Sequence, residues 1–192
     1  MKLYLVLDAA DTHVLEPALR GGVDVVQLRE KNLTDREIIR AARRFRLACT
    51  RYRALFILND RPDLVERCYA DGVHVGRSDA SVAEAREIVG ADRLVGLSAS
   101  TFEELADVEG ADYVGVTAFA TPTKEDAVPG GLELIRDAAA ALTVPWVGIG
   151  GIDLSNAGEV VAAGAPGIAV VRAIRDAEDP EAAARELKLL VG

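Results

Sequence analysis

The stretch VVQLREK, from Val25 to Lys31, runs from an apolar β-like segment into a polar end. Side chains alternate between the two faces of a β-strand. Gln27, Arg29 and Lys31 therefore share one face, while Val26 and Leu28 point to the other. Taken alone, the stretch fits either a strand that ends in solvent or a strand whose end binds a ligand. The pattern along the rest of the chain decides between these two interpretations.

Short apolar runs alternate with helical runs along the whole chain. Their richness in Val, Ile and Leu predicts strands, and their near-continuous apolar character is typical of strands buried on both faces of a parallel sheet. The predicted strands lie near Leu3–Leu7, Val23–Leu28, Ala54–Leu58, Gly72–Val75, Leu94–Leu97, Tyr113–Val116, Pro145–Ile149 and Gly167–Val171.

Eight strand–helix units in 192 residues predict an α/β fold with one small (β/α)8 TIM barrel, as a single domain over residues 1–192. An open doubly wound sheet is the alternative. It is disfavoured because none of the predicted strands is polar enough for an exposed edge.

Helix starts are marked by short capping motifs. TDRE at Thr34, SVAE at Ser81 and TFEE at Thr101 fit the capping box, in which a hydroxyl and a later Glu satisfy free backbone N–H groups. Asp179-Pro180 fits an N-cap followed by proline at the first helical position.

Composition limits the function classes. The net charge of −9 argues against a surface for nucleic acid or an anionic membrane. No apolar run approaches the roughly 20 residues of a membrane span, and the first residues do not resemble a signal peptide. Cys49 and Cys68, expected as buried thiols, favour a cytoplasmic protein. The oligomeric state is left open, with a homo-oligomer as one option.

Polar residues follow the carboxyl ends of the predicted strands rather than their amino ends. Functional groups of (β/α)8 barrels collect at that end. This asymmetry favours the ligand-binding interpretation of VVQLREK. The residues concerned are Gln27, Arg29 and Lys31, Asn59 and Asp60, Asp79, Ser98, Thr121, Thr123 and Lys124, Gly151, and the Val171-Arg172 turn.

These residue types indicate a site for phosphates. Asp60 and Asp79 are suited to one Mg²⁺, although either alone also fits a turn or cap. Arg29, Lys31 and Lys124 would clamp a group with several negative charges. The two glycines that end the seventh strand would offer backbone N–H groups to a second phosphate.

Other residues are assigned to structure. His74 is expected to be a hydrogen-bonded core histidine, His13 a surface residue and Trp146 a core residue. Neither a Ser–His–Asp nor a Cys–His arrangement can be assembled, which disfavours covalent catalysis by a protein nucleophile.

The motifs together resemble the thiamine-phosphate synthase family almost from end to end. They are LYLVLD at Leu3, GGVDVVQLREK at Gly21, LNDRPDL at Leu58, ADGVHVGRSD at Ala70, GLSAST at Gly96, GADYVGV at Gly110, TPTK at Thr121, GIGGI at Gly148 and AGAPGIAVVRAI at Ala163.

The resemblance implies a transferase that joins hydroxymethylpyrimidine diphosphate to thiazole phosphate and releases pyrophosphate. It implies that the pyrimidine–oxygen bond breaks first and that the thiazole nitrogen captures the carbocation. The implied diphosphate ligands are Gln27, Arg29, Lys31, Asn59 and Lys124, with Mg²⁺ on Asp60 and Asp79. The implied ligands of the thiazole phosphate or leaving group are Ser98, Thr121, Thr123, Gly151, Val171 and Arg172.

Three positions depart from the family pattern. Arg172 replaces a usual Ser, Ser100 replaces a usual His, and the stretch from Tyr113 to Lys124 is one residue shorter. Two alternatives remain: a related thiazole tautomerase, disfavoured because GVTAFATPTK has no His, and a non-catalytic thiazole phosphate-binding paralogue.

Overall fold

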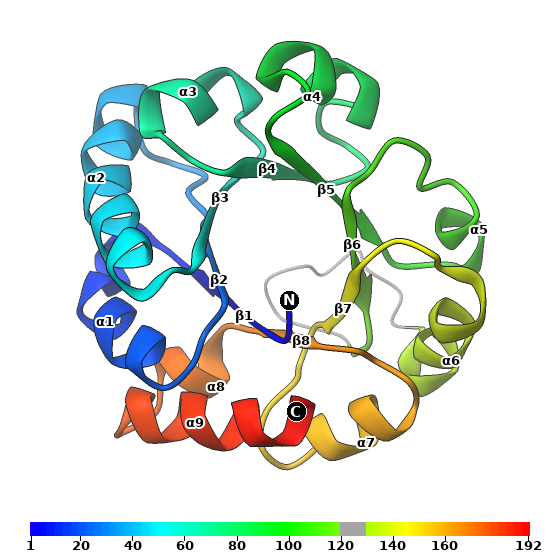
Figure 1. The fold of residues 1–192 in the computed structure, drawn as a ribbon. Coiled ribbons are helices and arrows are strands. Elements are labelled where there is room, and N and C mark those ends of the chain that lie inside the picture. Colours follow the sequence, from blue (N-terminus) through cyan, green and yellow to red (C-terminus); the bar gives the residue numbers. More distant parts are fainter. Residues whose placement is uncertain (120–129) are drawn as a thin grey trace.

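The fold is a closed barrel of eight parallel strands. A computed structural model describes residues 1–119 and 130–192. The strands pair in chain order, and β1 pairs with β8 to close the ring. Figure 1 looks along the barrel, with the strands forming the inner ring and the helices the outer one. The prediction of a small (β/α)8 barrel is therefore confirmed.

The strands are β1 (Leu3–Leu7), β2 (Val25–Leu28), β3 (Leu55–Asn59), β4 (Gly72–Val75), β5 (Leu94–Ala99), β6 (Tyr113–Thr117), β7 (Trp146–Ile149) and β8 (Ile168–Val170). The α-helices are α1 (Thr12–Arg20), α2 (Asp35–Tyr52), α3 (Val65–Cys68), α4 (Val82–Val89), α5 (Phe102–Leu105), α6 (Gly131–Ala141), α7 (Ala157–Ala162), α8 (Arg172–Arg175) and α9 (Pro180–Val191). The described residues also form two short 3-10 helices, η1 (Ala9–Asp11) and η2 (Pro62–Leu64).

The capping motifs mark helix starts as predicted, with one difference. The Glu37 and Glu84 carboxylates accept from the N–H groups of Thr34 and Ser81, which completes both capping boxes. At α5 the Glu104 carboxylate instead accepts from the N–H of Ser100, one residue earlier. The third box is therefore only half formed. Asp179 caps α9 as predicted, accepting from the N–H groups of residues 181 and 182 at 3.0 Å each.

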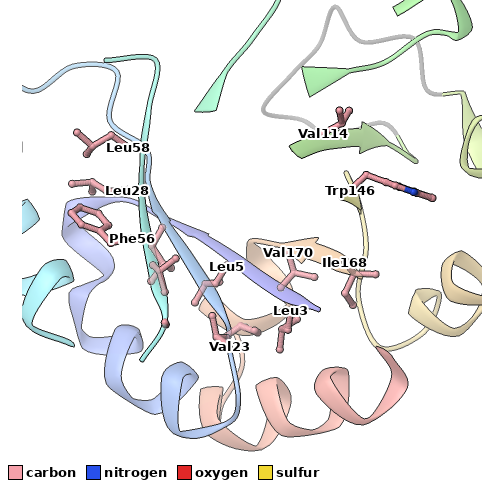
Figure 2. Close-up of a cluster of buried hydrophobic side chains, with 14 of the residues drawn as sticks. Leu3, Leu5, Val23, Leu28, Phe56, Leu58, Val114, Trp146, Ile168 and Val170 are labelled. Atoms are coloured by element: carbon pink, nitrogen blue, oxygen red, sulfur yellow. The ribbon is translucent and has the colours of Figure 1, made fainter. Parts of the chain in front are cut away.

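Apolar side chains form two separate layers. The outer layer fills the space between the barrel and its helices, and Figure 2 shows part of it, including Leu5, Phe56 and Ile168. Trp146 belongs to this layer, as predicted for a core residue. The inner layer fills the barrel itself and consists of Tyr4, Val6, Val25, Ile57, Tyr113, Val147 and Ala169. The alternation of side chains along each strand divides the residues between the two layers.

The Tyr113 ring inside the barrel requires a glycine on the neighbouring strand. Gly96 pairs with Tyr113 in the β5–β6 ladder. A Cβ atom added to Gly96 would lie 2.1 Å from the Cζ of Tyr113. Tyr113 thus occupies the volume that any other residue at position 96 would need.

Three aspartates tie together the amino ends of the barrel strands. Each directly precedes an even-numbered strand and accepts a hydrogen bond from a backbone N–H of the preceding odd-numbered strand. The pairs are Asp24 with Leu3 at 2.9 Å, Asp71 with Phe56 at 2.7 Å and Asp112 with Val95 at 2.7 Å. Each carboxylate also pairs with a cation of an outer helix: Lys188 of α9, Arg46 of α2 and Arg86 of α4.

Within the described ranges, no helix is both long and apolar enough to cross a membrane. Both cysteines are buried and free of disulfides, as the sequence predicts. His13 is exposed on α1, also as predicted.

We expect Gly96→Ala to destabilise the protein by about 2 kcal/mol or more, because the new methyl group overpacks the barrel interior. Gly158→Ala is the matched control, since nothing lies within 4 Å of the added Cβ in α7. It should leave stability unchanged or raise it by roughly 0.5–1 kcal/mol. Urea unfolding measures both variants. Equal stabilities would contradict the steric role of Gly96.

We expect Asp71→Ala to lower the free energy of unfolding by about 2–3 kcal/mol, because it leaves the Phe56 N–H and the Arg46 guanidinium without this acceptor. Asp63→Ala is the control. Asp63 pairs with Arg61 while 52% of its side chain is exposed, so its loss should cost less than about 1 kcal/mol. A similar loss of unfolding free energy in the two variants would contradict a special stabilising role for the hydrogen bonds of Asp71.

Candidate active site

The candidate site lies at the carboxyl-end rim, which we define as the ends of β2 to β8 together with the residues directly after them. Because all eight strands are parallel, these ends meet on one face of the barrel. The described site residues fall into three groups around this rim: a carboxylate pair, a polar line through the interior and a glycine turn.

Asp60 and Asp79 form the carboxylate pair. Asp60 directly follows β3 and has a left-handed backbone, with φ 59°, and its N–H donates to the carbonyl of His74 at 2.8 Å. The buried Asn59 amide donates to the Asp60 carboxylate. Asp79 lies in the turn after β4, where its carboxylate accepts from the N–H of Gly76 at 2.9 Å. Two loops on neighbouring strands thus bring both carboxylates to one place.

The two carboxyl groups interact strongly. Burial, and then the hydrogen bond and negative charge of Asp79, raise the pKa of Asp60 to about 6. The positive charge of Lys31 and the Asn59 amide act in the opposite direction. A carboxyl whose pKa is raised by burial and by a neighbouring carboxylate is a candidate for a functional group. The arrangement therefore offers oxygen ligands for one hard divalent ion.

Lys31, which follows β2, lies near this pair. Lys31 is exposed, and its charge reaches the Asp60 carboxyl. The N–H of Arg29 donates to the carbonyl of Leu7 at 2.9 Å, which extends the β1–β2 ladder by one bond and holds Arg29 at the rim. The structure therefore brings Lys31, Asn59, Asp60 and Asp79 together.

Gln27 and Ser98 belong to the interior line rather than to the surface of the rim. Gln27 is buried on β2, and its Nε2 donates to the hydroxyl of Tyr4 at 2.8 Å. The Ser98 Oγ lies 3.0 Å from the Nε2 of His74. His74 is a hydrogen-bonded histidine, as predicted, although it is only half-buried.

The glycine turn follows β7. Gly150 and Gly151 both have positive φ, of 98° and 61°. A Cβ atom on Gly150 would lie 2.5 Å from the carbonyl oxygen of Phe119, so the close approach requires glycine. Asn156 donates to the Gly151 carbonyl at 2.9 Å and fixes the turn.

Arg172 lies near the glycine turn. It begins the four-residue α8 directly after Val171, and its side chain is exposed. The Ser155 hydroxyl, and to a lesser degree the charge of Arg172, lower the pKa of Asp153. The guanidinium is therefore close to the loop that follows Gly151, where it adds positive charge.

Thr121, Thr123 and Lys124 lie outside the described residues, so their predicted roles stay predictions. Within residues 1–119 and 130–192, no three His, Cys, Asp or Glu side chains are arranged to hold a metal ion. The sequence predicted a pair of carboxylates, with the remaining ligands from water and substrate.

The sequence did not reveal the part played by Tyr4 and Tyr113. Both lie inside the barrel and connect Gln27 with His74. In the sequence, both tyrosines look like ordinary apolar residues of a strand. The only signal was the glycine at position 96, which had no turn to explain it.

Comparison with known proteins shows the family of this chain. The family model described as thiamine monophosphate synthase matches residues 3–174. The chain belongs to this family. A thiamine-phosphate synthase of Thermosynechococcus vestitus is 48% identical over 97% of this chain and 54% of its own length. One of Laribacter hongkongensis is 46% identical over 99% of this chain and 95% of its own length.

The lengths of these family members differ. The chain spans about half the length of the cyanobacterial relatives and nearly the whole of the Laribacter relative. Among solved structures, thiamine phosphate pyrophosphorylase from Pyrococcus furiosus superimposes with a TM-score of 0.92. It is 37% identical, over 99% of this chain and 95% of its own. The shared fold thus extends over the whole barrel.

We expect Asp79→Asn to stabilise the metal-free protein at pH 7.5 by about 1 kcal/mol. The expected gain is modest because water partly screens the repulsion between the Asp60 and Asp79 carboxylates. Asparagine keeps an oxygen for the Gly76 N–H and removes the charge that opposes Asp60. Because the pKa of Asp60 is raised in the folded state, its protonated carboxyl stabilises the fold. This stabilisation is complete below about pH 4 and is lost as the pH rises through about 6.

The gain in stability should therefore grow between pH 4.5 and 7.5, as measured by urea unfolding in EDTA. Asp92→Asn, at an exposed position, is the control and should show no such trend. A gain that is independent of pH would contradict the coupling between Asp60 and Asp79.

Proposed function

We propose that this protein is a thiamine-phosphate synthase. The reaction joins 4-amino-2-methyl-5-hydroxymethylpyrimidine diphosphate to 4-methyl-5-(2-phosphooxyethyl)thiazole, giving thiamine phosphate and pyrophosphate. The observation that carries the proposal is the Lys31–Asp60–Asp79 cluster, which lies on the same rim as the glycine turn and Arg172. The cluster around Asp60 and Asp79 suits a metal-bound diphosphate, and the glycine turn with Arg172 suits a monophosphate. Family membership supports the same assignment.

Asp60 and Asp79 would hold Mg²⁺, and their chemistry fits this ion. Both present carboxylate oxygens. The pKa of Asp60 is raised first by burial and then by the neighbouring Asp79 carboxylate, whose negative charge a cation would relieve. When bound, Mg²⁺ supplies charge neutralisation for a leaving pyrophosphate. The remaining ligands would be water and the diphosphate oxygens.

The protein's own cations would stabilise the same leaving group. Arg29, Lys31 and Lys124 would bind its oxygens as the pyrimidine carbon–oxygen bond breaks and pyrophosphate keeps the electron pair. Asn59 and Gln27 would hold the pyrimidine diphosphate in place. The thiazole nitrogen then forms the new bond to the pyrimidine carbon. This sequence needs no protein nucleophile, so the chain acts through positioning and charge.

The second substrate would bind between the glycine turn and the end of β8. Its phosphate would accept from backbone N–H groups near Gly151 and Val171, with Arg172 adding a positive charge. Ser98, Thr121 and Thr123 would complete the contacts to this phosphate or to pyrophosphate. Small molecules are thus the proposed partners, in place of nucleic acid or membrane.

The setting of the reaction is part of the proposal. Two free, buried cysteines fit the reducing cytoplasm. A homo-oligomer stays a prediction for solution measurements, and so does the single domain over residues 1–192.

We expect the purified chain to form thiamine phosphate from both substrates and Mg²⁺, as detected by mass spectrometry. EDTA should abolish product formation, because the carboxylate pair alone would repel the diphosphate. Lys124→Ala should lower kcat/KM by about 100-fold or more, in line with the loss of a charged contact to the leaving group.

Lys2→Ala is the matched control, since Lys2 is an exposed lysine that precedes β1 at the opposite end of the barrel. It should leave the rate unchanged. A folded wild-type protein that forms no product would refute the synthase assignment. Thiazole isomerisation would then be tested, followed by saturable binding of thiazole phosphate without turnover.

A further inference from the structure

Five polar side chains form one continuous hydrogen-bonded line through the barrel interior. It starts at Gln27 Nε2, which lies 2.8 Å from the Tyr4 hydroxyl. The Tyr4 and Tyr113 hydroxyls lie 3.0 Å apart. Tyr113 continues to His74 Nδ1 at 3.2 Å, and His74 Nε2 lies 3.0 Å from Ser98 Oγ. The five residues come from β2, β1, β6, β4 and β5, so only the closed barrel creates this line.

The line has one direction that satisfies every buried group. The Gln27 amide nitrogen only donates, so the Tyr4 oxygen accepts from it. Tyr4 then has one proton, which it gives to Tyr113, and Tyr113 gives its own proton to His74. The opposite direction would make Tyr4 accept twice and would leave its proton without an acceptor among its two described partners. A buried hydroxyl proton without an acceptor costs free energy inside a barrel.

Both phenols remain neutral and keep their protons. Burial is the largest effect at each of them, and it raises the pKa of Tyr4 and of Tyr113 well above the usual value of a tyrosine. The hydrogen bond between the two hydroxyls opposes this rise of the pKa at Tyr4 and adds to it at Tyr113. The direction of the line is therefore not altered by ionisation near neutral pH.

The direction fixes the tautomer of His74. Its Nδ1 accepts from Tyr113, so the ring proton sits on Nε2 and is donated to the Ser98 oxygen. Ser98 is half-buried at the carboxyl end of β5. Its own proton must then point away from the histidine ring, toward another acceptor. The ring lies beside Gly115 of β6, where an added Cβ would be in van der Waals contact with the His74 Cε1 at 3.4 Å.

We propose that His74 is a positioning residue that turns Ser98 into a hydrogen-bond donor for a substrate phosphate oxygen. His74 does so as the Nε2–H tautomer, which Tyr113 holds in place. The identity of that phosphate rests on the proposed function, whereas the tautomer does not. The line also connects two residues assigned to substrate binding, Gln27 and Ser98, so that each depends on the same buried hydroxyls.

The tautomer is tested first, by long-range ¹H–¹⁵N NMR of the uniformly labelled full chain. The chain has only two histidines, so comparison with His74→Gln assigns the signals. We expect the Nε2–H form for His74 at pH 7.5. The Nδ1–H form, or a doubly protonated ring, would overturn the proposal.

Two matched tyrosine variants then test the direction of the line. Tyr113→Phe removes the donor to His74, so the ring should become a mixture of tautomers. Tyr4→Phe removes an equally buried hydroxyl but leaves Tyr113 as donor, so the tautomer should stay unchanged. Tautomer mixing in both variants, or in neither, would overturn the proposal.

Activity provides the second readout. His74→Leu should lower kcat/KM for thiamine phosphate formation by about tenfold or more, as expected for a lost hydrogen bond to a charged group. His74→Gln should retain activity within about threefold, because its amide carries a donor and an acceptor side by side. Equal rates for the Leu and Gln variants would overturn the positioning role. If the wild type forms no product, the proposed function fails, and the NMR result alone decides the role of His74.

Discussion

The contact between the Tyr4 and Tyr113 hydroxyls, 3.0 Å apart in the middle of the barrel, constrains much of the structure. A closed ring of eight strands encloses a space that side chains must fill. Phenol rings fill it well, but each buried hydroxyl needs a partner. Gln27 and His74 are those partners, and Gly96 is the glycine that leaves space for the Tyr113 ring. The side chains that fill the barrel therefore also determine which polar groups, here Gln27 and His74, lie beneath the candidate site.

The two ends of the barrel carry different kinds of charge interaction. At the amino end, aspartates such as Asp24 and Asp71 pair with backbone N–H groups and with cations, so their charges are satisfied within the protein. At the carboxyl end, burial and then the neighbouring Asp79 carboxylate raise the pKa of Asp60. The first arrangement stabilises the fold, whereas the second leaves unbalanced charge that a ligand would relieve. This division of stability and chemistry is typical of the fold.

The local concentration of cations is notable in a chain with a net charge of −9. Lys31 lies beside the carboxylate pair, and Arg172 lies beside the loop that follows the glycine turn. Local charges set the affinity of a site more than the net charge does, because water and salt screen distant groups. An acidic protein thus has a cation at two places near the carboxyl-end rim, where a local positive charge would favour small anions more than its net charge would favour larger ones.

The sequence by itself determined the barrel, the capped starts of helices such as α4 and α9, and the residues at the strand ends, because periodicity and capping are local properties. It also placed Asp60 and Asp79 in neighbouring units. Only the tertiary structure showed that these two carboxyls interact and that Tyr4 and Tyr113 join Gln27 to His74. Such contacts depend on closure of the ring, which brings side chains from separate strands within hydrogen-bonding distance. No local pattern encodes that distance, so the direction of the buried line became readable only in three dimensions.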